Sequence, residues 1–566
     1  MRETVVGEKG SEEGVRRVTG YGSRDSMKRR SSIVFLLVVC AVMAQAVPAY
    51  RGPIVRTLED GTQKIVYMHG DEYSHYITDA EGQWLDHQTL QPLSTVDRQK
   101  RESGHRKANA RRIQAQKEWI GDQPNPAPRG LLLLVQFQDV KFTTPKDTLD
   151  SMLNGAHFSR SYEFDYPYGE QTYHFSIKAN GSARQYFQDQ SYGAYNPHFD
   201  VFGPVTLSKE MAYYGKDEID DDGNVTHDVK KRAFVKEACQ LADDAGANFS
   251  QYDFDGDGIV DYIYIIYAGF GEADGGGANT IWPHTWNVSY YKYEHDGKYI
   301  GTYACGSEMS YVSKVYDGIG TFCHEFSHVL GLPDFYETSY STGSHTLCEW
   351  DVMDQGPYNN NGNTPPAYSA YERFYMGWLT PRILHDPELV TLPSINDGKG
   401  ASLMVTSTDT HNLCGWDPEP REFYLLETRK RSGWDQHLPG VGLMITKISY
   451  DPSKWRFNTV NNDPQSMGVD IREAVQNDTY YGSDTDIYPA LHYITSWKDV
   501  EDHEVTHITR YRDDGRITFR YRGGTEDVES VQSSEVSIQK ILRDGQIIII
   551  RGNKEYTILG HENHQL

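Results

Sequence analysis

Residues 324–334 read His324-Glu325-Phe326-Ser327-His328-Val329-Leu330-Gly331-Leu332-Pro333-Asp334, a pattern that can bind a metal ion. Two histidines four positions apart lie on one face of a helix, so both imidazole rings can reach the same ion. The carboxylate of Glu325 can hold a water molecule on that ion without being a ligand itself. Catalytic zinc typically takes three protein ligands and a water. Gly331 can end the helix and turn the chain, which makes Asp334 the candidate third ligand.

The alternative for this stretch is an ordinary buried helix without a metal. Its apolar stripe would be the same in both cases and consists of Phe322, Phe326, Val329 and Leu330. The extension of the motif to positions 331 and 334 favours the metal site, because a core helix needs neither residue there.

A second motif follows at Trp350-Asp351-Val352-Met353-Asp354-Gln355-Gly356 and resembles the Met-turn of metzincin peptidases. Metzincins carry a third histidine where this chain has Asp334. The resulting pattern, H-E-x-x-H-x-x-G-x-x-D, resembles the immune inhibitor A family of secreted metallopeptidases. This resemblance implies that Met353 forms the hydrophobic floor beneath zinc, and that Tyr358 is a candidate donor to the oxyanion.

The resemblance covers residues 129–380 and implies an α+β chain with a zincin/metzincin-like catalytic domain. Its further motifs are Ala268-Gly269-Phe270-Gly271, residues 281–286 and residues 370–379. The second of these motifs contains His284, which is a further candidate ligand. Because the three-ligand set is complete without His284, we interpret it as a structural or cleft-lining residue.

The N-terminus has the three parts of a secretory signal peptide in residues 27–46. Lys28-Arg29-Arg30 precedes an apolar run over 33–44, and Ala44-Gln45-Ala46 predicts cleavage after Ala46. Because Met27 directly precedes the basic residues, we expect residues 1–26 to be an over-extended N-terminus. The apolar run is far shorter than the roughly 20 residues of a membrane span. We therefore expect a secreted or cell-surface protein without a transmembrane span in its mature chain.

Residues 47–128 resemble the N-terminal pro-region of the same family, which implies a zymogen. Short strand-like runs punctuated by glycines fill residues 50–97, and a polar helix is expected over 98–119. The proline-rich stretch 122–128 then marks a boundary.

Beyond residue 380 the pattern changes to strands separated by turns. The clearest runs, 423–427, 442–448 and 517–521, predict an antiparallel β-sandwich domain over 381–524. Residues 525–566 comprise a polar linker and a tail that resembles a Por-type (type IX) secretion sorting domain. The tail implies type IX-like secretion machinery as a partner. The alternative is a plain β-hairpin.

A separate acidic loop predicts a structural calcium site. Asp253, Asp255, Asp257 and Asp261 occupy positions 1, 3, 5 and 9 of an EF-hand-like loop, with the Ile259 carbonyl at position 7. These carboxylates repel one another unless a cation neutralises them. Position 12 is Tyr264 and not a bidentate glutamate, so the loop is not a complete EF-hand. The alternative is a solvated acidic turn.

The sequence therefore predicts a secreted zinc endopeptidase that hydrolyses extracellular proteins, with Glu325 as general base and zinc and calcium as cofactors. The net charge of −25 over 566 residues argues against nucleic acid as a partner. One alternative is a catalytically silent surface protein that binds host glycoprotein or peptide, which the intact Glu325 disfavours. A structural zinc domain is disfavoured because structural sites usually carry four ligands.

Overall fold

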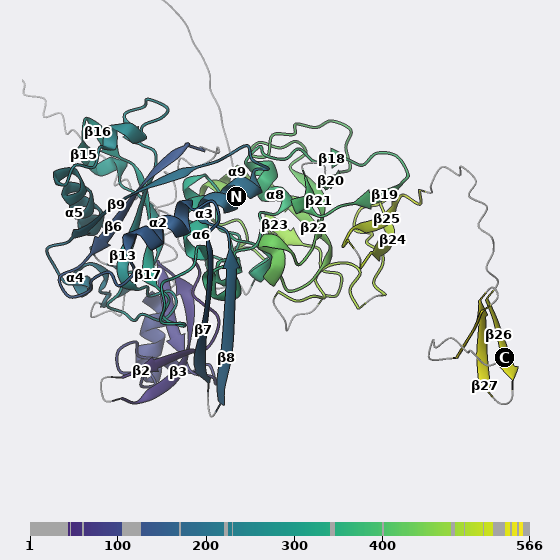
Figure 1. Cartoon of the computed structure of the whole chain (residues 1–566), viewed down its shortest axis with the longest axis horizontal. Coiled ribbons are helices and arrows are strands. Elements are labelled where there is room, and N and C mark those ends of the chain that lie inside the picture. The colour runs from purple at the N-terminus through teal and green to yellow at the C-terminus, as the bar shows by residue number, and fades with distance from the viewer. Residues whose placement is uncertain are drawn as a thin grey trace, which may run out of the picture. The chain divides into compact units, whose positions relative to one another are not determined.

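The structure is a computed structural model of the chain (Figure 1). It describes residues 44–45, 47–58, 61–104, 126–168, 171–219, 225–228, 230–339, 344, 346–398, 401–476, 482–491, 493–512, 514–524, 538–543, 546–551 and 554–557. The expected over-extended N-terminus, most of the expected signal peptide and residues 525–537 of the expected linker lie outside these residues, as does the expected helix beyond residue 104.

A six-stranded sheet forms the centre of the region expected to be catalytic (Figure 1). In spatial order its strands are β1 (Ala44–Gln45), β14 (His284–Asn287), β17 (Thr302–Met309), β13 (Ile263–Phe270), β6 (Arg129–Gln136) and β9 (His198–Thr206). The last four run parallel, whereas β14 and β1 are antiparallel to their neighbours. The continuous apolar run 131–135 in β6 is typical of a strand that is buried on both faces.

Helices cover both faces of this sheet. One face packs against α5 (Lys231–Asp244), where Leu133 and Phe234 share a cluster. The other face packs against α2 (Lys146–Asn154), α3 (Ala183–Gln190) and α6 (Gly320–Val329), where Leu132 meets Phe326. Because side chains alternate along a strand, neighbouring residues of β6 pack into two separate hydrophobic cores, one on each face of the sheet. The helix α6 that carries the metal motif is thereby fixed to the sheet.

The N-terminal residues form the strands expected in 50–97. They build a four-stranded antiparallel sheet of β2 (Ile54–Thr57), β3 (Gln63–Asp71), β4 (Ser74–Thr78) and β5 (Trp84–Leu85). Its apolar face packs in one cluster with Trp282 and Ala273 of the central region. This sheet, which we call the N-terminal sheet, therefore contacts the segment that leads into β14.

Two sheets follow residue 380. One has the order β18 (Arg382–Ile383), β20 (Ser402–Val405), β21 (Glu422–Arg429), β22 (Gly442–Ser449) and β23 (Val469–Ile471), and the other β19 (Glu388–Leu392), β25 (Ile517–Tyr521) and β24 (Val505–Arg510). One apolar cluster contains residues of both sheets. All their strand pairs are antiparallel except β18 with β20, which is parallel.

The remaining elements are short or peripheral. The strands are β7 (Ser159–Tyr168), β8 (Gln171–Asn180), β10 (Glu218–Ile219), β11 (Val225–Thr226), β12 (Ile259–Val260), β15 (Glu294–His295), β16 (Lys298–Ile300), β26 (Ile538–Arg543), β27 (Gln546–Arg551) and β28 (Lys554–Thr557). The helices are α4 (Met211–Gly215), α7 (Asn359–Gly362), α8 (Ala370–Tyr375) and α9 (Pro452–Arg456). In the expected tail, β26 to β28 form a three-stranded antiparallel sheet. Within the described residues, no helix is long and apolar enough to span a membrane.

The packing of α6 can be tested at Phe326, which is buried against Phe187, Phe199 and Tyr262. Replacing this side chain leaves a cavity, so Phe326→Ala should lower the free energy of unfolding by about 3–5 kcal/mol. Chemical denaturation measures the loss. The control is Phe175→Ala on β8, whose side chain is exposed. An equal loss in both variants would contradict this account of the core.

Candidate active site

Three predicted ligands converge on one point that is closed to solvent. His324 and His328 lie one turn apart on α6, and their Nε2 atoms are 3.1 Å apart. The Oδ1 atom of Asp334 lies 3.3 Å from Nε2 of His324 and 3.2 Å from Nε2 of His328. All three side chains are fully buried. The structure therefore brings together the three residues that the sequence pattern singles out.

The spacing of these atoms fits a tetrahedral zinc ion. Metal–ligand bonds of about 2.0–2.1 Å in tetrahedral geometry separate the ligand atoms by about 3.3 Å. Oδ1 of Asp334 has no hydrogen-bond partner among the described residues, although it is buried. Burial raises the pKa of this carboxyl, but the two imidazoles outweigh burial and hold its pKa below the usual range. An anionic carboxylate beside two imidazoles is a donor set that suits zinc.

Backbone carbonyls orient both imidazole rings. Nδ1 of His324 lies 2.7 Å from the carbonyl oxygen of Val352, and Nδ1 of His328 lies 2.8 Å from that of Leu332. Each contact turns the Nε2 atom toward the shared point, as outer-shell partners of metal-binding histidines do. Gly331 has a φ of +104°, a conformation that favours glycine and lets the chain turn back after α6.

Asp334 is held by a residue that the sequence analysis missed. The backbone N–H of Asp334 donates to Oδ1 of Asn458 over 2.7 Å, and Nδ2 of Asn458 donates to Oδ2 of Asp334. Asn458 follows α9, inside the region predicted to be a β-sandwich. No spacing rule connects positions 334 and 458, so only the folded chain reveals this support.

The carboxylate of Glu325 makes two hydrogen bonds. Its Oε1 accepts from the backbone N–H of Val47 over 2.8 Å, and its Oε2 accepts from Oγ1 of Thr285 over 2.8 Å. Burial raises the pKa of Glu325 well above its ordinary value, although these two donors oppose the shift. A carboxyl with a raised pKa is suited to accept and return a proton near neutral pH.

Residues 47–49 contact the residues around Glu325. Strand β1 pairs with β14, which lies beside α6 and would be the edge of the central sheet without β1. The Tyr358 hydroxyl donates to the carbonyl of Pro48 over 2.8 Å, and the Gln355 amide donates to that of Ala49 over 3.3 Å. Peptides commonly bind proteins by adding a strand to such an edge. Strand β1 occupies this edge of the central sheet.

Two other predicted residues are buried. Met353 is fully buried, and its carbonyl accepts from the N–H of Phe335, next to Asp334. His284 lies outside the ligand cluster, with Nδ1 2.7 Å from the Trp282 carbonyl and Nε2 2.7 Å from the Tyr303 hydroxyl. Both of its nitrogens are engaged, which agrees with a structural role for His284.

The predicted calcium loop is only partly assembled. Carboxylate oxygens of Asp253, Asp255 and Asp261 lie within 4.8 Å of one another, and Asp257 is not in that group. Nζ of Lys298 lies 2.6 Å from Oδ2 of Asp253, and this contact lowers the pKa of Asp253. A lysine beside the loop supplies part of the positive charge that the sequence analysis assigned to calcium alone.

Cys239, Cys305, Cys323, Cys348 and Cys414 are all free within the described part of the chain. Cys323 is buried next to His324 on α6.

Comparison with known proteins agrees with this geometry. Residues 116–379 match the catalytic domain of the immune inhibitor A peptidase family, M6. The chain is 28% identical to the pre-pro-metalloprotease PrtV of Vibrio cholerae over 345 residues, which is 53% of this chain and 36% of that protein. It is 30% identical to immune inhibitor A of Bacillus thuringiensis over 272 residues, 43% of this chain and 38% of that protein. The chain thus aligns with little more than a third of each relative. These matches support a metalloendopeptidase, a hydrolase.

Asn458 gives a test of how the third ligand is held. Asn458→Ala should weaken zinc binding by roughly 10–100-fold, because outer-shell partners of metal ligands contribute about that much. Competition with a zinc chelator of known affinity measures the change. The control is Asn462→Ala in the same segment, because Asn462 contacts Thr338 and not the ligand. Equal zinc affinity in the two variants would show that Asn458 does not support the site.

Proposed function

We propose that this chain, whose residues 116–379 match the M6 catalytic domain, is a secreted zinc-dependent endopeptidase that cleaves extracellular proteins. The observation that carries the proposal is the buried triangle of His324, His328 and Asp334, with side-chain atoms 3.1–3.3 Å apart beside Glu325. Three ligands leave one coordination position open, which distinguishes a catalytic zinc site from a closed structural one.

In this proposal zinc, Glu325 and Tyr358 each have a separate role in peptide hydrolysis. Zinc, when bound, would polarise the scissile carbonyl and lower the pKa of water. Glu325 would take the proton of the attacking water and deliver it to the nitrogen of the leaving amine, so that no net proton is consumed. Tyr358, which donates to the Pro48 carbonyl, is placed to donate to a substrate carbonyl as negative charge develops on it.

The segment 47–51 supports synthesis of this enzyme as a zymogen. Its backbone bonds to Glu325, Gln355 and Tyr358, and the guanidinium of Arg51 lies 3.9 Å from Asp354. A substrate cannot use these groups until the segment leaves. The name of the Vibrio relative, a pre-pro-metalloprotease, agrees with such a precursor.

The tail sheet β26–β28 supports a separate role in export. We assign it to recognition by type IX-like secretion machinery, which is consistent with a secreted or cell-surface protein. The rival function, a silent surface protein that binds host glycoprotein or peptide, would not require the proton-accepting Glu325 to be kept beside the ligands.

The general-base role predicts that Glu325→Gln keeps one zinc ion at the α6 site and loses proteolysis. The loss should be about 10²–10⁴-fold, the usual contribution of acid–base catalysis. Casein turnover and zinc content should be measured on the same activated preparation, with and without a chelator. The control is Glu294→Gln, whose side chain is exposed on β15. Activity of the Glu325 variant within tenfold of the control would reject the role.

Calcium is proposed as a structural ion of the 253–261 loop. Millimolar calcium should raise the melting temperature, because an ion that binds only the folded state adds about 2.7 kcal/mol at a hundredfold excess over Kd. Asp255→Ala combined with Asp257→Ala should abolish that response and leave the zinc content unchanged. The charge-matched control changes the exposed Glu163 and Asp165 of β7 to alanine. Identical melting curves with calcium and with a calcium chelator would show that the loop is an acidic turn that binds no calcium, with Lys298 supplying positive charge.

A further inference from the structure

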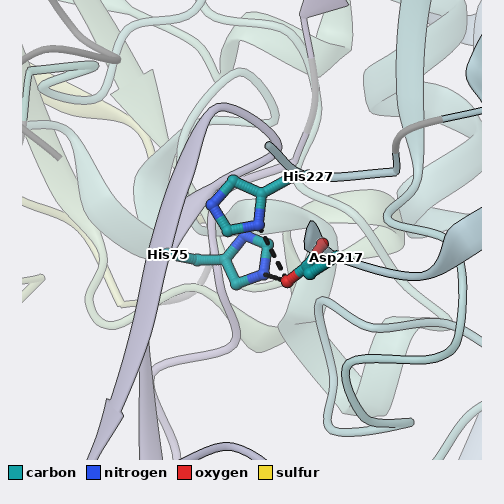
Figure 2. A group of neighbouring side chains, drawn as sticks. All are labelled: His75, Asp217 and His227. Carbon is teal, nitrogen blue, oxygen red and sulfur yellow. Dashed lines mark ion pairs between the residues drawn. The ribbon is translucent and has the colours of Figure 1, made fainter. Parts of the chain in front are cut away.

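A second group of side chains that could hold a metal ion shares no residue with the site above (Figure 2). His75 comes from β4 of the N-terminal sheet, Asp217 follows α4, and His227 follows β11. Oδ2 of Asp217 lies 3.4 Å from Nε2 of His75 and 2.9 Å from Nδ1 of His227. Figure 2 shows both imidazole rings directed at this carboxylate. Side chains from three separate segments thus meet at one oxygen atom.

Glu272 and His87 extend this group. Oε1 of Glu272 lies 3.1 Å from the same Nε2 atom of His75, and Nδ1 of His87 lies 3.9 Å from that oxygen. Glu272 is fully buried, and it follows β13 of the central sheet. The N-terminal sheet therefore contributes two histidines, and the central region contributes one histidine and two carboxylates.

Several of these atoms are buried without a hydrogen bond. Nδ1 of His227 is paired with Oδ2 of Asp217, whereas Nε2 of His227, both ring nitrogens of His87 and Oε2 of Glu272 have no hydrogen-bond partner in the described part of the chain. A buried polar atom without a partner is destabilising. A cation between His75, Asp217 and His227 would accept the lone pair of His227 Nδ1 and balance the negative charge of Asp217.

The geometry around His75 matches that of a metal ligand. Its Nδ1 lies 2.9 Å from the carbonyl oxygen of Asp71, which directs Nε2 toward Asp217 and Glu272. The two distances from Oδ2 of Asp217 to the histidines, 2.9 and 3.4 Å, are near the separation of about 3.3 Å expected around tetrahedral zinc. The Trp282 ring stacks on His75 with centroids 4.4 Å apart and closes one side.

We propose that His75, Asp217 and His227 bind a second divalent ion of the zinc class. Imidazole nitrogens select such an ion over calcium or magnesium, which prefer oxygen ligands. The three ligands come from three separate segments and their side chains are at most 11% exposed, which fits a structural ion. It fastens the N-terminal sheet, through His75, to the region that carries the active site. The proposal does not depend on the proposed peptidase activity.

Zinc content of the full chain tests this proposal. The parent protein carries Glu325→Gln to prevent self-digestion, and elemental mass spectrometry follows dialysis against a weak chelator. We expect two zinc ions per chain in the parent, one in His227→Ala and one in His324→Ala. The double variant of His227 and His324 should contain none. The matched control is His295→Ala, because His295 is buried and lies 2.8 Å from Asp243 without belonging to a metal-binding group among the described residues. It should keep two ions.

A second readout tests the fastening role and remains useful if His227→Ala folds poorly. Asp217→Asn preserves the shape of the side chain, and it should weaken zinc binding at this site at least tenfold. In this variant trypsin should cut the N-terminal sheet faster than in the parent, at Arg56 or Lys64, whereas the control should match the parent.

Equal zinc content in His227→Ala and in the parent would overturn the proposal. In that case His75 would instead be a protonated imidazolium between Asp217 and Glu272. Loss of the zinc at His324 alone would count against the proposed function and leave this site intact.

Discussion

The buried meeting of one carboxylate with two imidazoles is the constraint on which the rest of this structure depends. Asp334 carries a negative charge where no water reaches it, and an uncompensated charge there would be very costly. Its compensation must come from His324, His328 and the ion they are suited to bind. That requirement fixes the end of α6, the turn at Gly331 and the approach of Asn458. The central sheet and its helices provide the rigid support.

The same constraint explains why the N-terminal segment matters. Glu325 must be close to the ligands to serve as a base, and a free buried carboxylate would be unstable. Val47 and Thr285 supply the donors that satisfy it. Thr285 lies on β14, so the strand that pairs with β1 also contacts the proposed base.

The sequence predicted the parts of the site that follow local periodicity. A four-residue spacing places His324 and His328 together, and the apolar run of residues 131–135 marks the central strand. Asn458 and Val47 could not be predicted, because each reaches the site from a distant segment; Val47 lies 278 positions from Glu325. The second cluster of possible metal ligands could not be predicted for the same reason, because residues 75, 217, 227 and 272 show no spacing pattern. In the acidic loop, regular spacing gave no sign of Lys298.

The contact between Asp334 and Asn458 shows that the candidate site depends on residues beyond the matched catalytic domain. The region that matches a known family ends at residue 379, yet the residue that holds the proposed third ligand lies 79 positions further on (458 − 379). A chain cut at that boundary would keep the whole motif and lose its outer support. A recombinant chain that received its C-terminal sheets from a relative would lose the contact between Asn458 and Asp334 in the same way. In this protein the unit recognised by sequence is smaller than the unit that holds the ligands in place.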